Sequence, residues 1–275
     1  MFTPQLSNKK TIFHKILKQV RPASFQNILI NLLCGSAEKR RISILNEETG
    51  LEYWIDPFSN LGQSLLAKKT YEPETQKIIE NSLKAGNICI DVGANEGYFT
   101  CLMAKIVGDK GTVFAIEPQL RLLPLIFRNL NENLLFNAVI CNFCLSDKPA
   151  EKLSINLWPE INTGASSVAR RYRWSSRSQE IHAFNLDFFL EKRNIEKVDF
   201  VKIDVEGYEH EVICGMRDSL ETGKIKILAV DYHKNILGNR GLNSLDIHEI
   251  IQEHGYKTTG KDFALGNYAV YYRNP

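Results

Sequence analysis

The chain has 275 residues, enough for one large domain or for a catalytic domain with a modest extension. Contents of 44% hydrophobic and 24% charged residues are typical of a folded globular protein and exclude global disorder. The formal net charge of +2 is too small to indicate a nucleic-acid partner, and we expect none.

The lengths of the apolar segments and the cysteine content indicate the cellular compartment. No apolar run approaches the roughly 18 residues needed to span a bilayer, and the polar first residues lack the apolar core of a signal peptide. Six cysteines in a chain of this size do not suggest a disulfide scaffold. Cys141 and Cys144 form a C-x-x-C in or beside a predicted strand, where that spacing puts them on opposite faces. No second pair has zinc-ligand spacing. We therefore expect reduced thiols and a cytoplasmic protein.

Residues 1–80 are predicted to form a helical and hairpin extension. Apolar residues recur at helical spacing from Ile12 to Val20, among several lysines. We expect this helix to pack onto the body with a solvated basic face, although a basic amphipathic helix can also make peripheral contact with an anionic membrane. Residues 41–55 predict a hairpin with a turn near residues 48–50, and residues 74–83 predict a helix.

Residues 81–275 alternate between strand and helix patterns, which indicates an α/β fold with a doubly wound parallel sheet. Helices are expected at residues 99–106, 119–131 and 210–221, between the strands. The predicted strands are residues 88–92, 112–116, 138–143, 198–203 and 225–230, with two more at 256–259 and 268–273 closing one edge.

Residues 146–197 interrupt this alternation and end in a strand and helix of their own near residues 183–190. Long segments above the carboxyl edge of such a sheet often form a lid or a substrate wall. Residues 162–167 are small and polar and are expected to close over the cofactor or acceptor. Nearby arginines are expected to form a solvated face or to meet an acidic acceptor such as a phosphate or uronate; they are Arg170, Arg171, Arg173 and Arg177.

A glycine loop follows the first strand of the sheet and predicts a nucleoside-like ligand. A strand that ends in an acid, then two glycines, then a helix places backbone N–H groups at a helix N-terminus. The spacing G-x-x-x-G matches neither the dinucleotide fingerprint nor the phosphate-binding loop of nucleotide triphosphatases. Glu117, with Pro118 after it, ends the next strand, where such folds present an acid to a ribose. The expected cofactor-binding residues of the loop are Asp91, Gly93, Ala94, Asn95 and Gly97.

Residues 91–99 (Asp-Val-Gly-Ala-Asn-Glu-Gly-Tyr-Phe) and residues 202–209 (Lys-Ile-Asp-Val-Glu-Gly-Tyr-Glu) resemble the FkbM-type methyltransferases. The resemblance covers residue 41 to the C-terminus, and its D-x-E-G-x-E element is the more specific part. It implies a Rossmann-like sheet of the class I methyltransferase type with an antiparallel last strand. It also implies S-adenosylmethionine as cofactor, contacted by Asp147 and Asp204 as well. The implied acceptor is usually an oxygen of a small molecule, glycan or natural product. At Asp231 the family more often has glutamate.

Four residues at strand ends are the expected catalytic groups. An aliphatic hydroxyl is a poor nucleophile when neutral, and a general base adds about 10²–10⁴ in rate. The candidates are Asp204 and Glu206 on one strand end and Asp231 and His233 on the next. His233 is expected to accept a proton near neutral pH, oriented by a neighbouring acid. The alternative is that these side chains only hold their loops by hydrogen bonds.

The same four residues are also possible ligands for a divalent metal, as carboxylates at comparable strand ends are in catechol-type methyltransferases. No ligand spacing in the sequence demands a metal, so none is expected. Two other functions stay open: an N-methyltransferase with the same cofactor site, and a non-catalytic S-adenosylmethionine-binding module. A nicotinamide dehydrogenase is disfavoured by the loop spacing. The sequence leaves the oligomeric state open.

Overall fold

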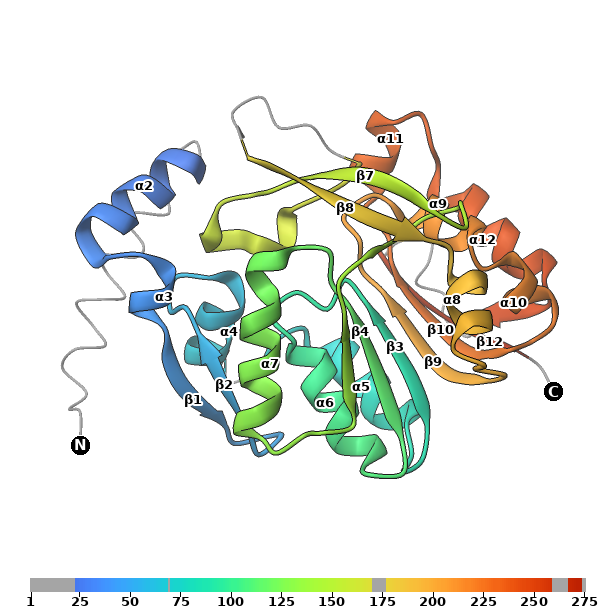
Figure 1. The fold of residues 1–275 in the computed structure, drawn as a ribbon, viewed down its shortest axis with the longest axis horizontal. Helices are drawn as coiled ribbons and strands as arrows, with labels where there is room; N and C mark the ends of the chain where they lie inside the picture. The colour runs from blue at the N-terminus through green and yellow to red at the C-terminus, as the bar shows by residue number, and fades with distance from the viewer. Residues whose placement is uncertain (1–22, 69, 170–176, 259–266, 274–275) are drawn as a thin grey trace.

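The computed structural model describes residues 23–68, 70–169, 177–258 and 267–273 (Figure 1). The amphipathic helix expected from Ile12 to Val20 lies outside these ranges, as do Arg170, Arg171 and Arg173.

Seven strands form one sheet through the middle of the molecule (Figure 1). Their order is β11-β12-β10-β9-β3-β4-β5, and the first five strands in sequence pair in parallel. The last strand runs antiparallel to both of its neighbours, β10 and β11. The expected Rossmann-like sheet with a reversed last strand is confirmed. The strand bounds are β3 Ile88–Val92, β4 Thr112–Ile116, β5 Ala138–Cys141, β9 Val198–Ile203, β10 Ile225–Asp231, β11 Tyr256–Thr258 and β12 Tyr268–Arg273.

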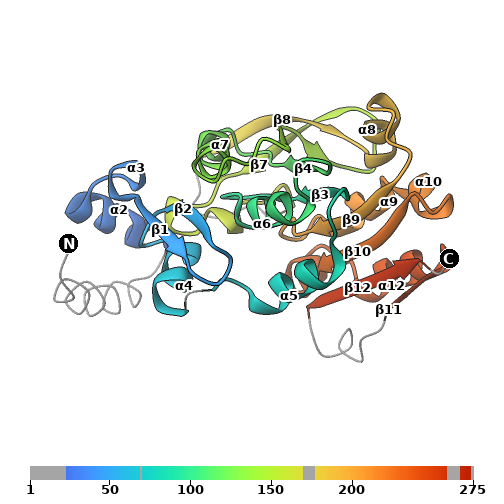
Figure 2. The same ribbon diagram turned by 90° about the horizontal axis from the view of Figure 1, so that it is seen from below.

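Helices cover both faces of this sheet, as Figure 2 shows from below. Successive strand residues point to opposite faces, so Ile90 joins one hydrophobic cluster and Cys89 the other. The cluster with Cys89 includes residues of α5 (Pro73–Ser82), α6 (Tyr98–Val107) and α7 (Leu123–Glu132). The cluster with Ile90 includes residues of α8 (Leu186–Lys192), α9 (Glu209–Cys214), α10 (Arg217–Glu221) and α12 (Ser244–Glu253). Burial on both faces explains why these strands are continuous apolar runs.

Three local predictions differ from the structure. A short 3₁₀ turn, η1 (Leu120–Leu122), precedes α7, so the helix expected from residue 119 begins later as an α-helix. Residues 210–221 form two helices, because the chain breaks at Gly215, where a Cβ would overlap the carbonyl oxygen of Ser146. The third strand ends at Cys141, and Cys144 belongs to β6 (Cys144–Leu145) in another sheet. Both thiols are free and lie in one buried cluster, not on opposite faces of a single strand.

The N-terminal elements pack beside α6 and α7 (Figure 1). They are α2 (Ala23–Cys34), α3 (Ala37–Arg40), the hairpin β1 (Ile42–Asn46) and β2 (Leu51–Ile55), and α4 (Asn60–Lys68). The predicted hairpin is confirmed, and its second strand shares the hydrophobic cluster of α6. The proposed boundary at residue 80 falls inside α5, so the extension and the sheet share one core. Among the helices that the structure describes, none has the length and apolar character needed to cross a bilayer.

The segment 146–197 adds a small second sheet. Strands β7 (Glu151–Asn156) and β8 (Ser178–Phe184) pair antiparallel, and β6 pairs with β8. The turn between β7 and β8 contains a 3₁₀ stretch, η2 (Glu160–Ala165), which lies above the upper ends of β3 and β4 in Figure 1. The strand and helix expected near residues 183–190 are β8 and α8. A further helix, α11 (Lys234–Asn239), follows β10.

Candidate active site

One pocket lies at the carboxyl ends of the central parallel strands, where open α/β sheets bind ligands. Its walls come from the ends of β3, β4, β9 and β10, from η2, and from the turn before α5. Six acidic side chains line it, and His233 is its one titratable nitrogen among the described lining residues. The acids are Glu72, Glu96, Glu117, Asp204, Glu206 and Asp231. The pocket therefore favours cationic ligands.

The glycine loop turns from β3 into α6 along one wall of this pocket. The backbone N–H groups of Gly93 and Ala94 donate to the carbonyl oxygen of Ile116, at 3.0 and 3.1 Å. Gly93 has φ +84°, Gly97 has φ +82°, and Asn95 is also left-handed with φ +50°. A Cβ on Gly93 would overlap the carbonyl oxygen of Asp204, so only glycine fits there. The loop is thus packed directly against the second motif.

Glu117 ends β4 beside this loop and is almost fully buried. Its Oε2 accepts the N–H of Asn95 at 2.7 Å, and its Oε1 accepts the N–H of Gln119 at 2.9 Å. Burial raises the pKa of the Glu117 carboxyl to about 7, although the two backbone hydrogen bonds lower it. Each carboxylate oxygen has a second lone pair, so both can still accept a hydroxyl. This geometry suits a ribose ligand.

A buried lysine joins the two motifs across the sheet. Nζ of Lys202 lies 3.3 Å from Oδ1 of Asp91 and 3.6 Å from Oδ2 of Asp204. The other oxygen of Asp91 accepts the hydroxyl of Thr100 at 2.7 Å. Burial alone lowers the pKa of Lys202, but the charges of Asp91 and Asp204 outweigh it and raise the pKa well above its usual range. Asp91 therefore supports the loop from behind and does not line the pocket.

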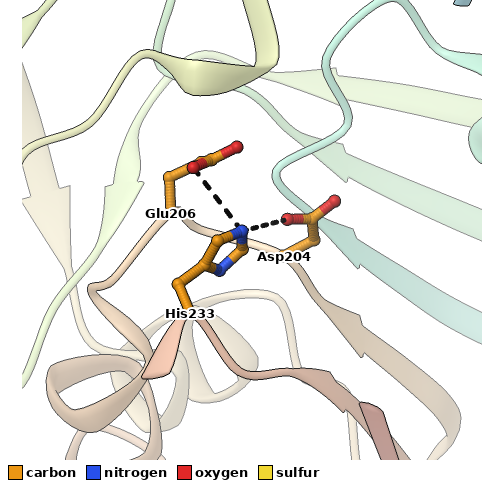
Figure 3. Close-up of side chains that lie close together, drawn as sticks. All are labelled: Asp204, Glu206 and His233. Carbon is orange, nitrogen blue, oxygen red and sulfur yellow. Dashed lines mark ion pairs between the residues drawn. The ribbon is translucent and has the colours of Figure 1, made fainter. Parts of the chain in front are cut away.

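His233 lies among carboxylates at the end of β10 (Figure 3). Its Nδ1 is 2.7 Å from Oε1 of Glu209, whose side chain is fully buried. Its Nε2 is 3.5 Å from Oε2 of Glu206 and 3.9 Å from Oδ1 of Asp204. The structure thus brings together Asp204, Glu206 and His233, as the sequence predicts, and adds Glu209 as the group that orients the ring.

These neighbours change the protonation of the imidazole. Burial alone lowers the pKa of His233, but the hydrogen bond with Glu209 and the charges of Asp204 and Glu206 raise it to about 10. These contacts favour the protonated ring at neutral pH, and the role of His233 as a base stays a prediction. Burial raises the pKa of Glu206 to about 7, against the lowering effect of His233. Burial and the charge of Asp204 raise the pKa of Asp231 to about 6.

The 3₁₀ stretch η2 and the residues after it bridge the two motifs over the pocket. Oγ1 of Thr163 lies 2.8 Å from Oδ1 of Asn95 in the glycine loop. Oγ of Ser167 donates to the carbonyl oxygen of Glu206 at 2.6 Å. Residues 162–164 and 166–168 line the pocket, so the small polar segment forms part of its wall. That residues 146–197 act as a lid stays a prediction.

The remaining expected residues take different positions. Gly93, Asn95, Glu117 and Pro118 line the pocket together with the four expected catalytic groups. Ala94 and Gly97 belong to the loop but do not line the pocket, and Asp147 is exposed outside it. Four groups of the site were not predicted to have a role, and they are Glu72, Glu96, Lys202 and Glu209. The last three lie within the two motifs, but each pairs with a residue distant in the chain, which local sequence does not show.

The chain is similar to known methyltransferases. The Methyltransferase FkbM domain model matches residues 91–258, more than half of the chain. The hexuronic acid methyltransferase AglP of Haloferax volcanii is 25% identical over 204 residues, which cover 71% of this chain and 76% of that protein.

Solved structures with a related arrangement include a proposed rRNA methylase from Clostridium thermocellum. It has a TM-score of 0.48 and 12% identity, and the match covers 75% of this chain and 98% of that one. An S-adenosylmethionine-dependent methyltransferase from Aquifex aeolicus has a TM-score of 0.41 and 17% identity, with 76% and 91% covered.

The family match falls on the two motifs that form the pocket. It begins at Asp91, at the start of the glycine loop, and includes the Asp204 and His233 loops. The chain therefore belongs to the FkbM methyltransferase family and is an S-adenosylmethionine-dependent methyltransferase.

Proposed function

We propose that this enzyme methylates a hydroxyl oxygen of a glycan or another small polyhydroxyl molecule. The observation that carries this proposal is the position of Asp204, Glu206, Asp231 and His233 on the wall of the cofactor pocket. Acidic groups at this wall can take the proton that a hydroxyl must lose, and an amine with a free lone pair needs no such group.

The reaction joins the acceptor oxygen to the methyl carbon while the bond from that carbon to sulfur breaks. The products are a methyl ether, S-adenosylhomocysteine and one proton. Asp231 is the proposed acceptor of that proton, which it then passes to solvent. Protonated His233 is proposed to hold Asp204 and Glu206 in place, because its ring lies between them. Aligning acceptor, methyl and sulfur supplies up to roughly 7–11 kcal/mol.

The cofactor is proposed to lie along the glycine loop with its ribose on Glu117. Gly93, Asn95, Pro118 and Asp204 line that part of the pocket. Asp91, Ala94 and Gly97 support the loop from within. The proposed contact of Asp147 with the cofactor depends on movement of its exposed loop.

The proposed acceptor class is supported by the relative in Haloferax volcanii, which is named a hexuronic acid methyltransferase. A hexuronic acid offers hydroxyl and carboxyl oxygens and no nitrogen. Oxygen methylation of a sugar acid is therefore the first activity to assay. The expected absence of a nucleic-acid partner and the cytoplasmic location stay predictions, as does membrane contact through residues 9–21.

A second candidate is N-methylation, favoured by the acidic lining of the pocket. Carboxylates attract a protonated amine, and the described lining residues include no lysine or arginine. A third candidate is a binding module without turnover, which would bind S-adenosylmethionine and methylate no acceptor.

The deciding experiment compares hydroxyl and amine acceptors with radiolabelled S-adenosylmethionine. Glucuronic acid and its 2-amino-2-deoxy analogue are a suitable pair. We expect methylation of glucuronic acid. Asp231→Asn should lower kcat by about 10²-fold or more. Asp246→Asn, at an exposed acid on α12, is the matched control with unchanged kcat. Transfer to the amine alone, or full activity of Asp231→Asn, would contradict the proposal.

A further inference from the structure

Three side chains from neighbouring strand ends direct their ligand atoms toward one point of the pocket (Figure 3). One carboxylate oxygen of Asp204, one of Glu206 and Nε2 of His233 all lie within 4.8 Å of one another. The side chains are 27%, 23% and 21% exposed, so a small ion can reach them while most water is kept away. Oxygen and imidazole nitrogen together form a ligand set for a divalent metal.

The distances describe a gap between the three groups. Nε2 of His233 lies 3.5 Å from Glu206 and 3.9 Å from Asp204, beyond the 2.7–3.2 Å of an N–H···O hydrogen bond. Ligands at roughly 2.1 Å from an octahedral ion lie roughly 3 Å from one another in adjacent positions. To bind such an ion, His233 needs to approach each carboxylate by less than about 1 Å, and the oxygens of Asp204 and Glu206, within 4.8 Å of each other, need to approach by up to roughly 1.8 Å.

The histidine is oriented as metal-binding histidines are. Metal-ligating imidazoles almost always donate their second ring N–H to a carboxylate or carbonyl, which fixes the tautomer. Here Nδ1 faces Oε1 of Glu209 at 2.7 Å, and Oε1 also accepts the N–H of Gly207 at 2.9 Å. Glu209 is fully buried, so this orientation is rigid. A cation that binds here displaces the proton from Nε2, while Nδ1 stays the donor to Glu209. Nε2 then presents a lone pair to the cation, which holds Asp204 and Glu206 in place of the proton.

The charge around the ring is unbalanced without another cation. Asp204, Glu206 and Glu209 lie within 4 Å of the ring nitrogens of His233, and Asp231 is a further acidic group near them. Lys202, 3.6 Å from Asp204, is the second cationic side chain here, but it also pairs with Asp91. Oε2 of Glu209 is buried and has no hydrogen-bond partner among the described residues. Unpaired charge in a desolvated site is strongly unfavourable. A dication between the three ligand atoms removes this excess.

We propose that Asp204, Glu206 and His233 bind a divalent cation of the Mn²⁺ type, with Glu209 as the positioning residue. Carboxylates suit Mg²⁺ and Mn²⁺, and the imidazole shifts the preference toward a first-row transition ion. This inference rests on the proposed hydroxyl acceptor, whose oxygen a cation at this place would orient and whose loss of a proton it would favour. A cation also offsets the repulsion between the acidic pocket and a sugar acid.

The first test titrates Mn²⁺ into the full-length protein after treatment with a chelator. The electron paramagnetic resonance signal of dissolved Mn²⁺ reports the free ion. We expect one Mn²⁺ bound per chain in the wild type. Glu206→Gln and His233→Gln should lose binding, and Glu209→Gln should weaken it by about 10–100-fold. Glu132→Gln, which removes an exposed carboxylate on α7, is the matched control and should bind as the wild type does.

The second test needs no variant, so a folding defect cannot obscure it. Mn²⁺ broadens nearby resonances, so a substoichiometric amount should remove the ring signals of His233 before those of His182. His182 is exposed on β8 and belongs to no part of the site. Equal broadening of both rings, or an absence of bound Mn²⁺ in the wild type, would overturn the inference.

Failure of this inference is distinguishable from failure of the proposed function. Methyl transfer to the hydroxyl acceptor at an unchanged rate in excess chelator would overturn the metal site and leave the function intact. One bound Mn²⁺ together with transfer to amines alone would keep the site and reject the hydroxyl acceptor. A rate that depends on Mn²⁺ in the wild type and in Glu132→Gln supports both.

Discussion

The carbonyl oxygen of Asp204 occupies the space that a Cβ on Gly93 would need, so the glycine loop and the D-x-E-G loop touch through their backbones. The N–H of Asp204 also donates to the carbonyl oxygen of Val92 at 3.0 Å. The two loops therefore cross in direct backbone contact, and this crossing couples the cofactor side of the pocket to the acceptor side. A change at either residue is expected to affect both.

Gly93→Ala tests this crossing. Gly86 has nearly the same φ, +86° against +84°, but a Cβ there meets nothing within 4 Å. Gly86→Ala should lower the free energy of unfolding by about 1–2 kcal/mol from backbone strain alone. Gly93→Ala adds overlap with backbone and should lower it by about 4 kcal/mol or more. Urea unfolding measures both values, and calorimetry should find weaker S-adenosylmethionine binding only in Gly93→Ala. Equal effects of the two substitutions would argue against a tight crossing.

Lys202→Met tests the buried charge that joins the motifs. The Lys202 side chain is 3% exposed and faces Asp91 and Asp204, so its removal leaves two carboxylates without their counter-charge. We expect the free energy of unfolding to fall by about 3–5 kcal/mol. Lys197→Met is the control, because Lys197 is 67% exposed and its pair with Asp199 contributes about 0–1 kcal/mol. Similar unfolding midpoints for both variants would show that Lys202 contributes little.

Glu117 predicts a pH dependence of cofactor affinity. The pKa of its carboxyl is raised to about 7 mainly by burial, so the group is charged above that pH and neutral below it. A charged carboxylate accepts ribose hydroxyls more strongly, so S-adenosylmethionine should bind less tightly as the pH falls through 7. Glu117→Gln should weaken S-adenosylmethionine binding by about tenfold or more, and the remaining affinity should not depend on pH. Calorimetry between pH 6 and pH 8 is the measurement, with Glu253→Gln at an exposed acid as the control. A pH-independent affinity in the wild type would remove Glu117 from the ribose site.

Arg41→Met tests the link between the N-terminal hairpin and the glycine loop. Nη1 of Arg41 lies 3.1 Å from Oε2 of Glu96, which lines the pocket and is 2% exposed. Burial raises the pKa of Glu96, and Arg41 opposes that shift. Without Arg41 the buried carboxyl loses its partner, so stability and cofactor affinity should both fall, affinity by about tenfold. Lys148→Met at the exposed pair with Glu151 should leave both unchanged. Thermal unfolding and calorimetry separate the two effects, and unchanged affinity in Arg41→Met would exclude the link.

Most of the sheet is predictable from local sequence. Residues 88–92, 112–116 and 198–203 form strands with the expected bounds, because short apolar runs between turns suit strands buried on both faces. The breaks at Gly215 and Cys141 were not predictable. They depend on what lies beside them, the carbonyl of Ser146 in one case and a second sheet in the other.

Several residues of the site were predictable from the sequence, but the contacts between their side chains were not. Asp204, Glu206 and His233 stand at strand ends, and parallel strands place those ends at one edge. Glu209 is the last residue of the second motif and the first of α9, 24 residues before His233, and nothing in the spacing links it to the histidine. The protonation of His233 depends on that contact, so local sequence alone does not determine its charge.

The sequence by itself determined the strands, the glycine loop and the family to which the chain belongs, because each depends on residues adjacent in the chain. Only the tertiary structure decided that Lys202 pairs with Asp91, 111 residues away in the chain, as well as with Asp204. It also decided that three carboxylates surround the imidazole of His233. The physical reason is that electrostatic energy depends on distance and burial, and both are set by the order of the strands in the sheet.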